Sequence, residues 1–175
     1  MKKIIITCLI TSCVTLGIVH LYDNWYISYN IRKYSVYYAH NMEHKDGTYP
    51  ELAMVLDNLD LMRKPKKSNI DYRYDGRCII YNFKYKVDNN VPRLSRTNWS
   101  DDTVYCFVDN KYSSYYFDRS FEIKDGFSRT DTTYREIDVN AVDKDAVYHD
   151  LHKNFGFLVE ANVHRKPLIN MQKEF

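Results

Sequence analysis

The chain opens with an apolar run over residues 4–22, and no charged residue interrupts it before Asp23. An α-helix rises 1.5 Å per residue, so a run of this length nearly crosses a hydrocarbon core of about 30 Å. Lys2 and Lys3 precede the run and Asp23 follows it, which favours a cytoplasmic N-terminus under the positive-inside rule. We predict a transmembrane signal anchor over residues 1–22.

The same run has two further interpretations. Ile10-Thr11-Ser12-Cys13 is similar to a bacterial lipobox, whose cysteine becomes acylated, although residues 14–19 stay apolar where a lipoprotein normally turns polar. A cleaved secretory signal is the other alternative, but no A-x-A-like site closes the run. All three interpretations place the rest of the chain outside the cytoplasm.

A second pattern follows, in which apolar residues recur at steps of three and four. It comprises Ile27, Ile31, Tyr34, Tyr38 and Met42. This spacing predicts an amphipathic helix. Because no proline precedes Pro50, we predict one helix from Ile4 to about His44, with residues 23–46 as the amphipathic continuation of the anchor.

The segment Asp46-Gly47-Thr48-Tyr49-Pro50-Glu51 is expected to end this helix and start another. Gly47 suits the left-handed position after a helix end, and Pro50 suits the first position of a new helix. The buried face of that short helix is predicted to comprise Leu52, Val55, Leu56 and Leu59.

The third pattern is strand-like alternation, which dominates the remainder of the chain. Strands are predicted at 70–74, 79–87, 103–108, 111–117, 121–127 and 134–139, with a hairpin turn at Asp75-Gly76. A late helix is predicted over 143–155, closed by Gly156. Residues 47–175 are therefore expected to form an α+β head, in which the long helix is packed by a short helix and an antiparallel β-sheet, with a late helix.

Composition supports a sheet and excludes one class of partner. The chain has 17 tyrosines but only 5 glycines and 4 prolines, a balance that favours half-buried sheet surfaces. The net charge is +2, which Lys2 and Lys3 account for, so a neutral remainder argues against nucleic acid as a partner. The basic run over residues 63–67 is interpreted as a solvated loop, with contact to phosphate or lipid headgroups as the alternative.

The four cysteines form two pairs. Cys8 and Cys13 lie in the apolar start, whereas Cys78 and Cys106 lie in strand-like segments. Outside the cytoplasm a Cys78–Cys106 disulfide is the expected state. Zinc is a weaker alternative, because neither cysteine has a Cys or His neighbour at ligand spacing.

One motif raises the possibility of catalysis. His40-Asn41-Met42-Glu43-His44 matches the H-x-x-E-H pattern of zinc peptidases, in which His40 and His44 would share a helix face and Glu43 would activate a water. Glu122, Glu136 and Glu160 are the candidates for a third ligand. Such enzymes are much larger and need a second helix, so we interpret the motif as a polar helix end and expect no catalytic residue, metal or cofactor.

A tyrosine cluster offers a candidate binding face. Tyr112, Tyr115 and Tyr116 lie among Asn and Asp residues and are able to line a ligand or sugar surface. Alternating tyrosines on a sheet are more often packing residues, which is the interpretation we prefer.

The layout resembles type IV pilins and type II secretion pseudopilins. The local basis is Tyr37-Tyr38-Ala39 and Asn41 followed by Asp46-Gly47-Thr48-Tyr49-Pro50-Glu51-Leu52, which is similar to the pilin pattern of an aromatic-rich helix end, Asn/Asp-Gly-x-Tyr-Pro and a short helix. The resemblance implies a membrane helix that continues into a head with an antiparallel sheet. It covers residues 1–62 by pattern and the remainder by architecture.

Two features of pilins are absent from the sequence. Gly17 is followed by Ile18 rather than by Phe or Met, and no acidic residue lies in the apolar helix at the fifth mature position. The expectation is therefore a non-catalytic, membrane-anchored cell-envelope protein, periplasmic in a Gram-negative cell, that binds other envelope proteins. The alternatives are a lipoprotein acylated at Cys13 and, more remotely, a zinc metallopeptidase using His40, Glu43 and His44.

Overall fold

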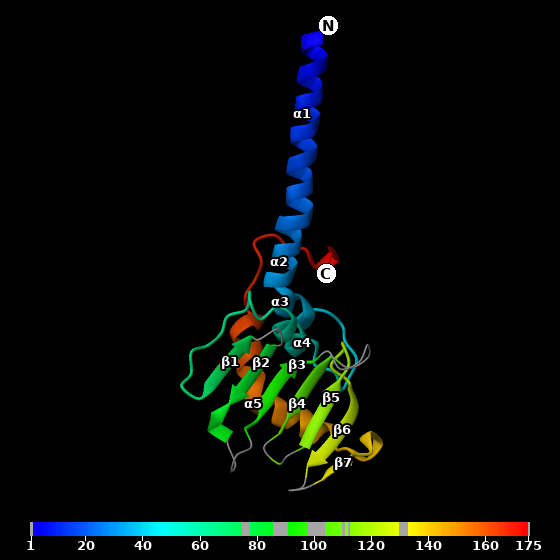
Figure 1. Ribbon diagram of the computed structural model, residues 1–175, viewed down its shortest axis with the longest axis vertical. Helices are drawn as coiled ribbons and strands as arrows, with labels where there is room; N and C mark the ends of the chain where they lie inside the picture. The colour runs from blue at the N-terminus through cyan, green and yellow to red at the C-terminus, as the bar shows by residue number, and fades with distance from the viewer. Residues whose placement is uncertain are drawn as a thin grey trace.

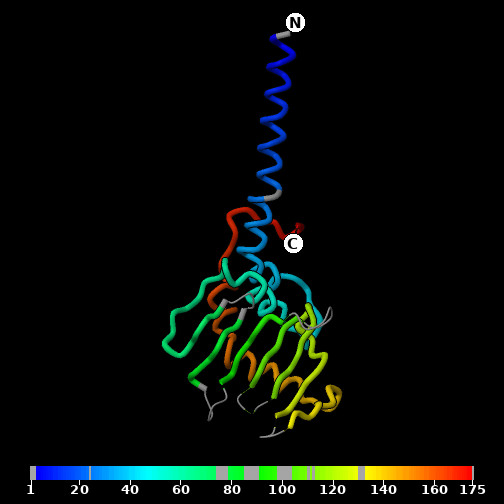
Figure 2. Tube along the Cα trace, in the orientation of Figure 1, coloured from blue at the N-terminus to red at the C-terminus, as the bar shows by residue number. Residues whose placement is uncertain are grey.

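The computed structural model describes residues 2–74, 78–85, 91–97, 104–109, 111, 113–129 and 133–174. A long N-terminal helix leads into a head made of one antiparallel sheet with helices packed on one side (Figures 1 and 2). The predicted α+β class, with an apolar N-terminal helix and a late helix, is confirmed.

The N-terminal part is helical almost without interruption from Lys2 to His40. It comprises α1 (Lys2–Leu21), a π-helical segment η1 (Tyr22–Ile27), α2 (Ser28–Lys33) and α3 (Ser35–His40). Tyr34 separates α2 from α3, because its backbone angles, φ −112° and ψ 15°, are not helical. The helix ends at His40 rather than near His44, so the predicted extent of the amphipathic part is too long by about one turn.

The turn chemistry after this helix is as predicted. Gly47 has φ 74°, in the left-handed region that glycine tolerates without a Cβ clash. Pro50 is the first residue of α4 (Pro50–Asp57), whose apolar face is fully buried. Thr48 donates a hydrogen bond to the carbonyl oxygen of Lys45 at 2.6 Å, which closes the turn.

The sheet has seven strands in simple meander order, each antiparallel to the next. They are β1 (Ile70–Tyr74), β2 (Cys78–Asn82), β3 (Arg93–Arg96), β4 (Tyr105–Val108), β5 (Ser113–Phe117), β6 (Ile123–Arg129) and β7 (Tyr134–Glu136). The late helix is α5 (Lys144–Val163). There are also three short 3₁₀ segments, η2 (Phe83–Tyr85), η3 (Val139–Ala141) and η4 (Gln172–Glu174). The Asp75-Gly76 turn lies outside the described residues.

The core lies between one face of the sheet and the helices α3, α4 and α5. Ile80, Leu94 and Phe107 stand in one register row on neighbouring strands and are fully buried. Phe155 of α5 meets Phe107 edge-on, with ring centroids 6.1 Å apart. Such aromatic pairs add to the burial of apolar area that holds the two layers together.

Two predicted boundaries and one missed strand differ from the prediction for identifiable reasons. The return strand predicted over 79–87 ends at Asn82, where a 3₁₀ turn begins. β3 was not predicted, since Leu94 is its only apolar residue and its place depends on pairing with both neighbours. Gly156 does not close the late helix, which continues to Val163. The glycine makes room for the His152 ring, since a Cβ at this position would come within 2.7 Å of it.

Candidate functional site

The face of the sheet opposite the helices carries two rows of side chains that do not belong to the core between sheet and helices. One register row across it comprises Ile79, Ser95, Cys106 and Tyr116. The next row comprises Tyr81, Arg93, Val108 and Ser114. These are the residues that alternate with the buried core positions along each strand, so they face away from the helices.

A shallow groove of about 250 Å³ lies on this face. Its lining is Ile79, Tyr81, Arg93, Ser95, Arg96, Thr97, Cys106 and Tyr116. The lining contains two arginines and no carboxylate, but carboxylates flank it: Asp57 of α4 pairs with Arg96 at 3.4 Å, and Asp125 is the register partner of Tyr116. Arg93 is exposed and forms no ion pair with the described residues. The groove therefore combines aromatic rings with the cationic side chain of Arg93.

The two tyrosines at the groove are held by their neighbours. The Arg73 guanidinium lies 4.9 Å from the ring centroid of Tyr81, and Phe83 stacks on the same ring at 6.1 Å. Tyr116 meets Phe127 edge-on at 5.9 Å. Their rings thus form stacking surfaces of fixed orientation, the kind of residue that anchors protein interfaces.

Cys106 lies at the base of the groove and is a free thiol. Burial raises its pKa to about 11, although the charge of Arg93 and a hydrogen bond from Tyr116 oppose this shift. Burial of Tyr116, together with the charge of a Cys106 thiolate and the hydrogen bond to it, raises the pKa of the Tyr116 hydroxyl. Because the thiolate is the reactive form of cysteine, Cys106 has a packing role rather than a nucleophilic one.

The expected Cys78–Cys106 disulfide is not present. Cys78 begins β2 and Cys106 lies in β4, with β3 paired between them. Neighbouring strands lie about 4.8 Å apart, so two steps separate the backbones by about 10 Å. A disulfide requires Cα atoms within about 7 Å, and the sheet register therefore prevents the bridge.

The tyrosine cluster predicted from the sequence is divided between the two sides of the sheet. Tyr115 shares the register row of Phe107 and stacks on it at 6.4 Å, facing the helices. Tyr116 faces the groove. Tyr112 lies outside the described residues. The packing interpretation thus holds for Tyr115, whereas Tyr116 is available to a ligand.

A second hollow of about 480 Å³ opens between the β4–β5 hairpin and the first half of α5. Asp109, Asp143 and Asp150 line it together with Lys111 and Lys153. The Asp109 carboxylate accepts hydrogen bonds from the backbone N–H groups of Lys111 and Ser113 at 2.7 and 2.9 Å. Burial raises the pKa of Asp109 despite these bonds. Its main role is to close the hairpin.

The H-x-x-E-H motif, considered as a remote alternative for zinc, does not bring its side chains together. His40 is the last residue of α3 and its Nδ1 lies 3.2 Å from Glu51 Oε1, whereas Nδ1 of His44 lies 3.1 Å from the carbonyl oxygen of Met42. Because the helix has ended, His40 and His44 do not share a face, and Glu43 is exposed in the turn. No group of three His, Cys, Asp or Glu side chains among the described residues is placed to hold a metal ion.

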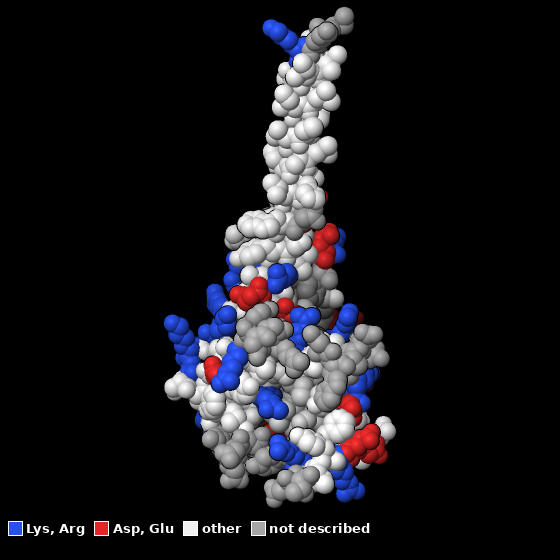
Figure 3. Space-filling view, in the orientation of Figure 1, with Lys and Arg blue, Asp and Glu red and all other residues white. Residues whose placement is uncertain are grey.

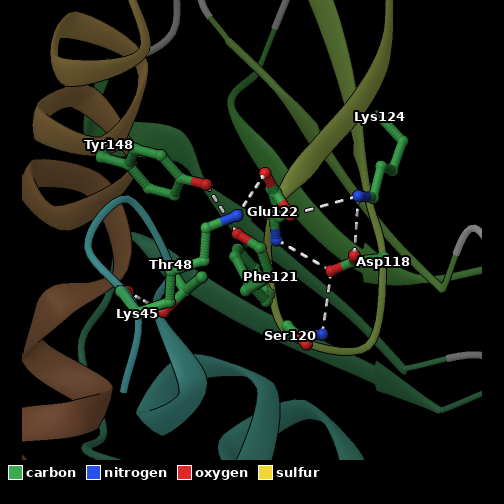
Figure 4. Close-up of polar contacts among 8 residues, drawn as sticks. All are labelled: Lys45, Thr48, Asp118, Ser120, Phe121, Glu122, Lys124 and Tyr148. Atoms are coloured by element: carbon green, nitrogen blue, oxygen red, sulfur yellow. Dashed lines mark hydrogen bonds and ion pairs between the residues drawn. The ribbon is translucent and has the colours of Figure 1, made fainter.

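The connection between the N-terminal helix and the sheet is fixed by a polar network (Figure 4). Lys45 contacts Glu122 at 3.1 Å, and Lys124 contacts both Glu122 and Asp118, at 3.1 and 3.2 Å. Hydrogen bonds from the two lysines lower the pKa of Glu122. The network holds the β5–β6 turn against the segment that follows His40.

Phe121 is the apolar centre of the same turn. It has φ 62°, a left-handed conformation that is uncommon outside glycine, yet its ring is fully buried. The ring stacks on Phe117 at 4.6 Å and on Tyr105 at 5.0 Å, and Tyr148 donates a hydrogen bond to its carbonyl oxygen at 2.6 Å. These contacts stabilise the strained backbone.

The N-terminal helix itself exposes a long apolar surface. Among the described residues, one helix, Lys3–Lys33, is long enough and apolar enough to cross a membrane. The head buries none of its most apolar 18-residue stretch. Leu9 and Leu16 are 61% and 68% exposed. Figure 3 shows this rod without charged side chains between its tip and the head. Cys13, the candidate acylation site, lies in the middle of α1 and is exposed.

The three threonine hydroxyl groups of α1 are satisfied within the helix. Thr7, Thr11 and Thr15 each donate a hydrogen bond to the carbonyl oxygen four residues earlier, at 3.0, 2.9 and 2.9 Å. These hydroxyls therefore need no water. Polar side chains in hydrocarbon have to be satisfied within the protein in this way.

Comparison of the chain with known protein families, with curated proteins and with solved structures finds no match. Function therefore has to be argued from the groove, the anchor and their geometry.

Proposed function

We propose that this chain is a non-catalytic, membrane-anchored protein of the cell envelope that binds another protein through the uncovered face of its sheet. In this account α1 spans the bilayer with the N-terminus in the cytoplasm, and the head stands on the other side. The resemblance to pilins describes the same arrangement, a membrane helix that continues into an α+β head.

The exposure of α1 is the observation that carries the proposal. Its 20 residues rise about 30 Å, the thickness of a hydrocarbon core. A continuous apolar surface of this extent is not stable in water unless a membrane or a partner covers it. A membrane accounts for three features together: the length of the helix, the internally bonded threonines and the aromatic residues that follow in η1.

The aromatic residues at the end of α1 mark where the bilayer would end. Tyr22 stacks on Tyr26 and Trp25 stacks on Tyr29, with centroids 5.2 and 6.2 Å apart. Trp25 is 73% exposed. Tryptophan and tyrosine prefer the membrane–water interface, so η1 fits the headgroup layer.

The orientation follows from the charges beside the helix. Lys2 and Lys3 lie at one end and Asp23 at the other. Positive residues next to a short loop are retained in the cytoplasm, which places the head outside. In a Gram-negative cell the head would be periplasmic.

Extraction with alkaline carbonate tests the anchor. The full chain is expected to remain in the membrane pellet, and Cys13→Ala is expected to remain there equally, because α1 rather than an acyl chain holds it. Cys8→Ala is the matched control, being exposed in the same helix. A soluble mature chain, or loss of both processing and membrane retention in Cys13→Ala alone, would contradict a signal anchor, and the second outcome would favour the lipoprotein.

The groove is the proposed protein-binding site. Two stacking tyrosines lie beside Arg93, which has no ion-pair partner in the described part of the chain; they suit a partner surface that presents a carboxylate next to an apolar side chain. Arginine is the residue best suited to such a contact, because its planar guanidinium binds a carboxylate through two parallel hydrogen bonds.

Photo-crosslinking in intact cells tests this site. A photoreactive phenylalanine in place of Tyr81 is expected to give one discrete adduct that Arg93→Glu abolishes and that Arg135→Glu, an exposed charge on β7, leaves unchanged. The same probe at Tyr134, also on β7 and 72% exposed, serves as the positional control. Equal labelling from both positions, or an adduct insensitive to Arg93, would contradict the assignment.

A further inference from the structure

The segment between α5 and η4 carries an exposed apolar tip. Residues 164–171 leave the end of α5 and return to the N-terminal helix, and we refer to them as the C-terminal loop. Leu168 is 97% exposed and Ile169 is 52% exposed. Two neighbouring aliphatic residues at this exposure form a small apolar surface that a lipid or protein contact would cover.

Both ends of the C-terminal loop are fixed to the head. At the start, Arg165 donates a hydrogen bond to the carbonyl oxygen of Leu61 at 2.8 Å, and its guanidinium lies 5.5 Å from the ring centroid of Tyr34. At the end, the Met171 backbone N–H donates to the Tyr38 hydroxyl at 3.2 Å, and Met171 is buried. The tip therefore projects from a fixed base.

The direction of the projection is towards the anchor. In Figures 1 and 2 the loop rises along the axis of the N-terminal helix, past α3, to the level where η1 meets α2. The body of the head lies on the opposite side of this level. If α1 fills the hydrocarbon core, η1 crosses the headgroup layer, which is about 5–7 Å deep. The far end of η1, to whose level the loop rises, then lies at the outer edge of this layer.

The charges around the tip suit a lipid surface. Arg165 and Lys166 precede Leu168, and Lys173 follows the loop in η4. Arg32 and Lys33 lie in α2, beside which the loop rises. Apolar residues between basic ones are the pattern of segments that insert into the headgroup–acyl boundary of anionic membranes.

We infer that the C-terminal loop is a second membrane contact, in which Leu168 and Ile169 insert into the bilayer interface while the exposed Lys166 and Lys173 face anionic headgroups. This inference rests on the proposed anchor, since the loop reaches the interface only when α1 spans the membrane. The loop and α1 then hold the head at two points, which restricts its tilt and fixes the direction in which the groove faces.

Site-specific fluorescence on the reconstituted full chain tests the contact. An environment-sensitive nitrobenzoxadiazole label is attached at Leu168→Cys in a background with Cys8→Ser, Cys13→Ser and Cys78→Ser, with Cys106 retained because it is buried. The vesicles contain phosphatidylcholine and phosphatidylglycerol. The label at position 168 is expected to show a blue-shifted emission that is quenched by lipid carrying a doxyl group near the headgroup. This quenching should be several-fold stronger than that of the same label at Lys144→Cys, at the far end of α5.

A label at Ile10→Cys in the same background separates the two proposals. Quenching at Ile10 by a doxyl group deep in the acyl chains, with an unquenched and unshifted label at Leu168, would overturn the loop contact and leave the anchor intact. No quenching at Ile10 would overturn both. A blue-shifted label at Leu168 that lipid quenchers do not reach would also overturn the lipid contact, because it would show that protein covers the loop.

Discussion

At the scale of single residues, several polar side chains act on the backbone rather than on a ligand. Asp109 closes the β4–β5 hairpin by accepting two backbone hydrogen bonds, and Asp118 does the same for the β5–β6 turn, bonding to Ser120 and Glu122 at 2.9 Å each. Neither residue lies in a regular element, so hydropathy patterns do not identify them. Their position between two strand-like segments is the only sequence signal.

Asp109 gives a prediction with a defined pH dependence. Its pKa is raised above 3.8 by burial, so the folded state binds the proton more tightly than the unfolded chain. Ionisation of Asp109 therefore lowers the free energy of unfolding as pH rises from about 3.8 through the higher folded-state pKa. Asp109→Asn keeps the acceptor oxygen without the charge, and it is expected to be at least as stable as the natural chain at neutral pH.

Asp109→Ala removes the acceptor and is the matched comparison. It leaves two backbone N–H groups without their partner, which is expected to cost about 1–3 kcal/mol. Thermal unfolding of the full chain in detergent, followed at neutral and acidic pH, measures both variants. The advantage of Asp109→Asn over the natural chain should diminish on acidification. An Asn variant as unstable as the Ala variant at neutral pH would contradict this account of the carboxylate.

At the scale of elements, α2 and α3 are joined to α4 by one buried amide. Asn58 accepts a hydrogen bond from Arg32 Nε at 3.0 Å and donates to the Ser35 hydroxyl at 3.2 Å and to the carbonyl oxygen of Met54 at 3.2 Å. Arg32 also pairs with Asp60 at 3.0 Å, with both side chains about half exposed. The buried contacts, rather than the surface ion pair, couple the anchor to the head.

This difference predicts unequal effects for two neighbouring substitutions. Asn58→Ala leaves buried polar groups unsatisfied and is expected to lower the free energy of unfolding by about 2 kcal/mol. Asp60→Ala removes an exposed ion pair and is expected to cost less than about 1 kcal/mol. Chemical denaturation of the two purified variants in the same detergent measures both. A larger loss in Asp60→Ala would show that the surface pair is the main link.

The elements also show which parts of the fold follow from sequence. The left-handed Gly47, Pro50 at the helix start and the buried face of α4 are local signals, and each was predicted. β3 was not, because its stability comes from two neighbouring strands rather than from its own residues. The groove combines side chains from four strands, so its membership depends on the register, which the sequence does not state. The cysteine pairing failed for the same reason.

At the scale of the whole molecule, the proposed function needs a head held at the membrane with one face of its sheet open to a partner. In that proposal α1 is the anchor, the buried contacts of α3 and the ion pairs around Glu122 join it to the head, and the groove around Arg93 is the binding site. Each part has a defined contact to the next. The function therefore depends on α1 crossing the bilayer with the head on the outer side.

Labelling of both ends of the chain in intact cells tests this dependence most directly. One cysteine is inserted directly after Met1, which keeps Lys2 and Lys3, and another is placed separately at Lys144→Cys, both in the background with Cys8→Ser, Cys13→Ser and Cys78→Ser; a membrane-impermeant maleimide is then added. The proposed orientation predicts that position 144 is labelled at once and that the N-terminal cysteine is labelled only after the membrane is permeabilised. Labelling of the N-terminal cysteine without permeabilisation, or protection of position 144, would contradict it.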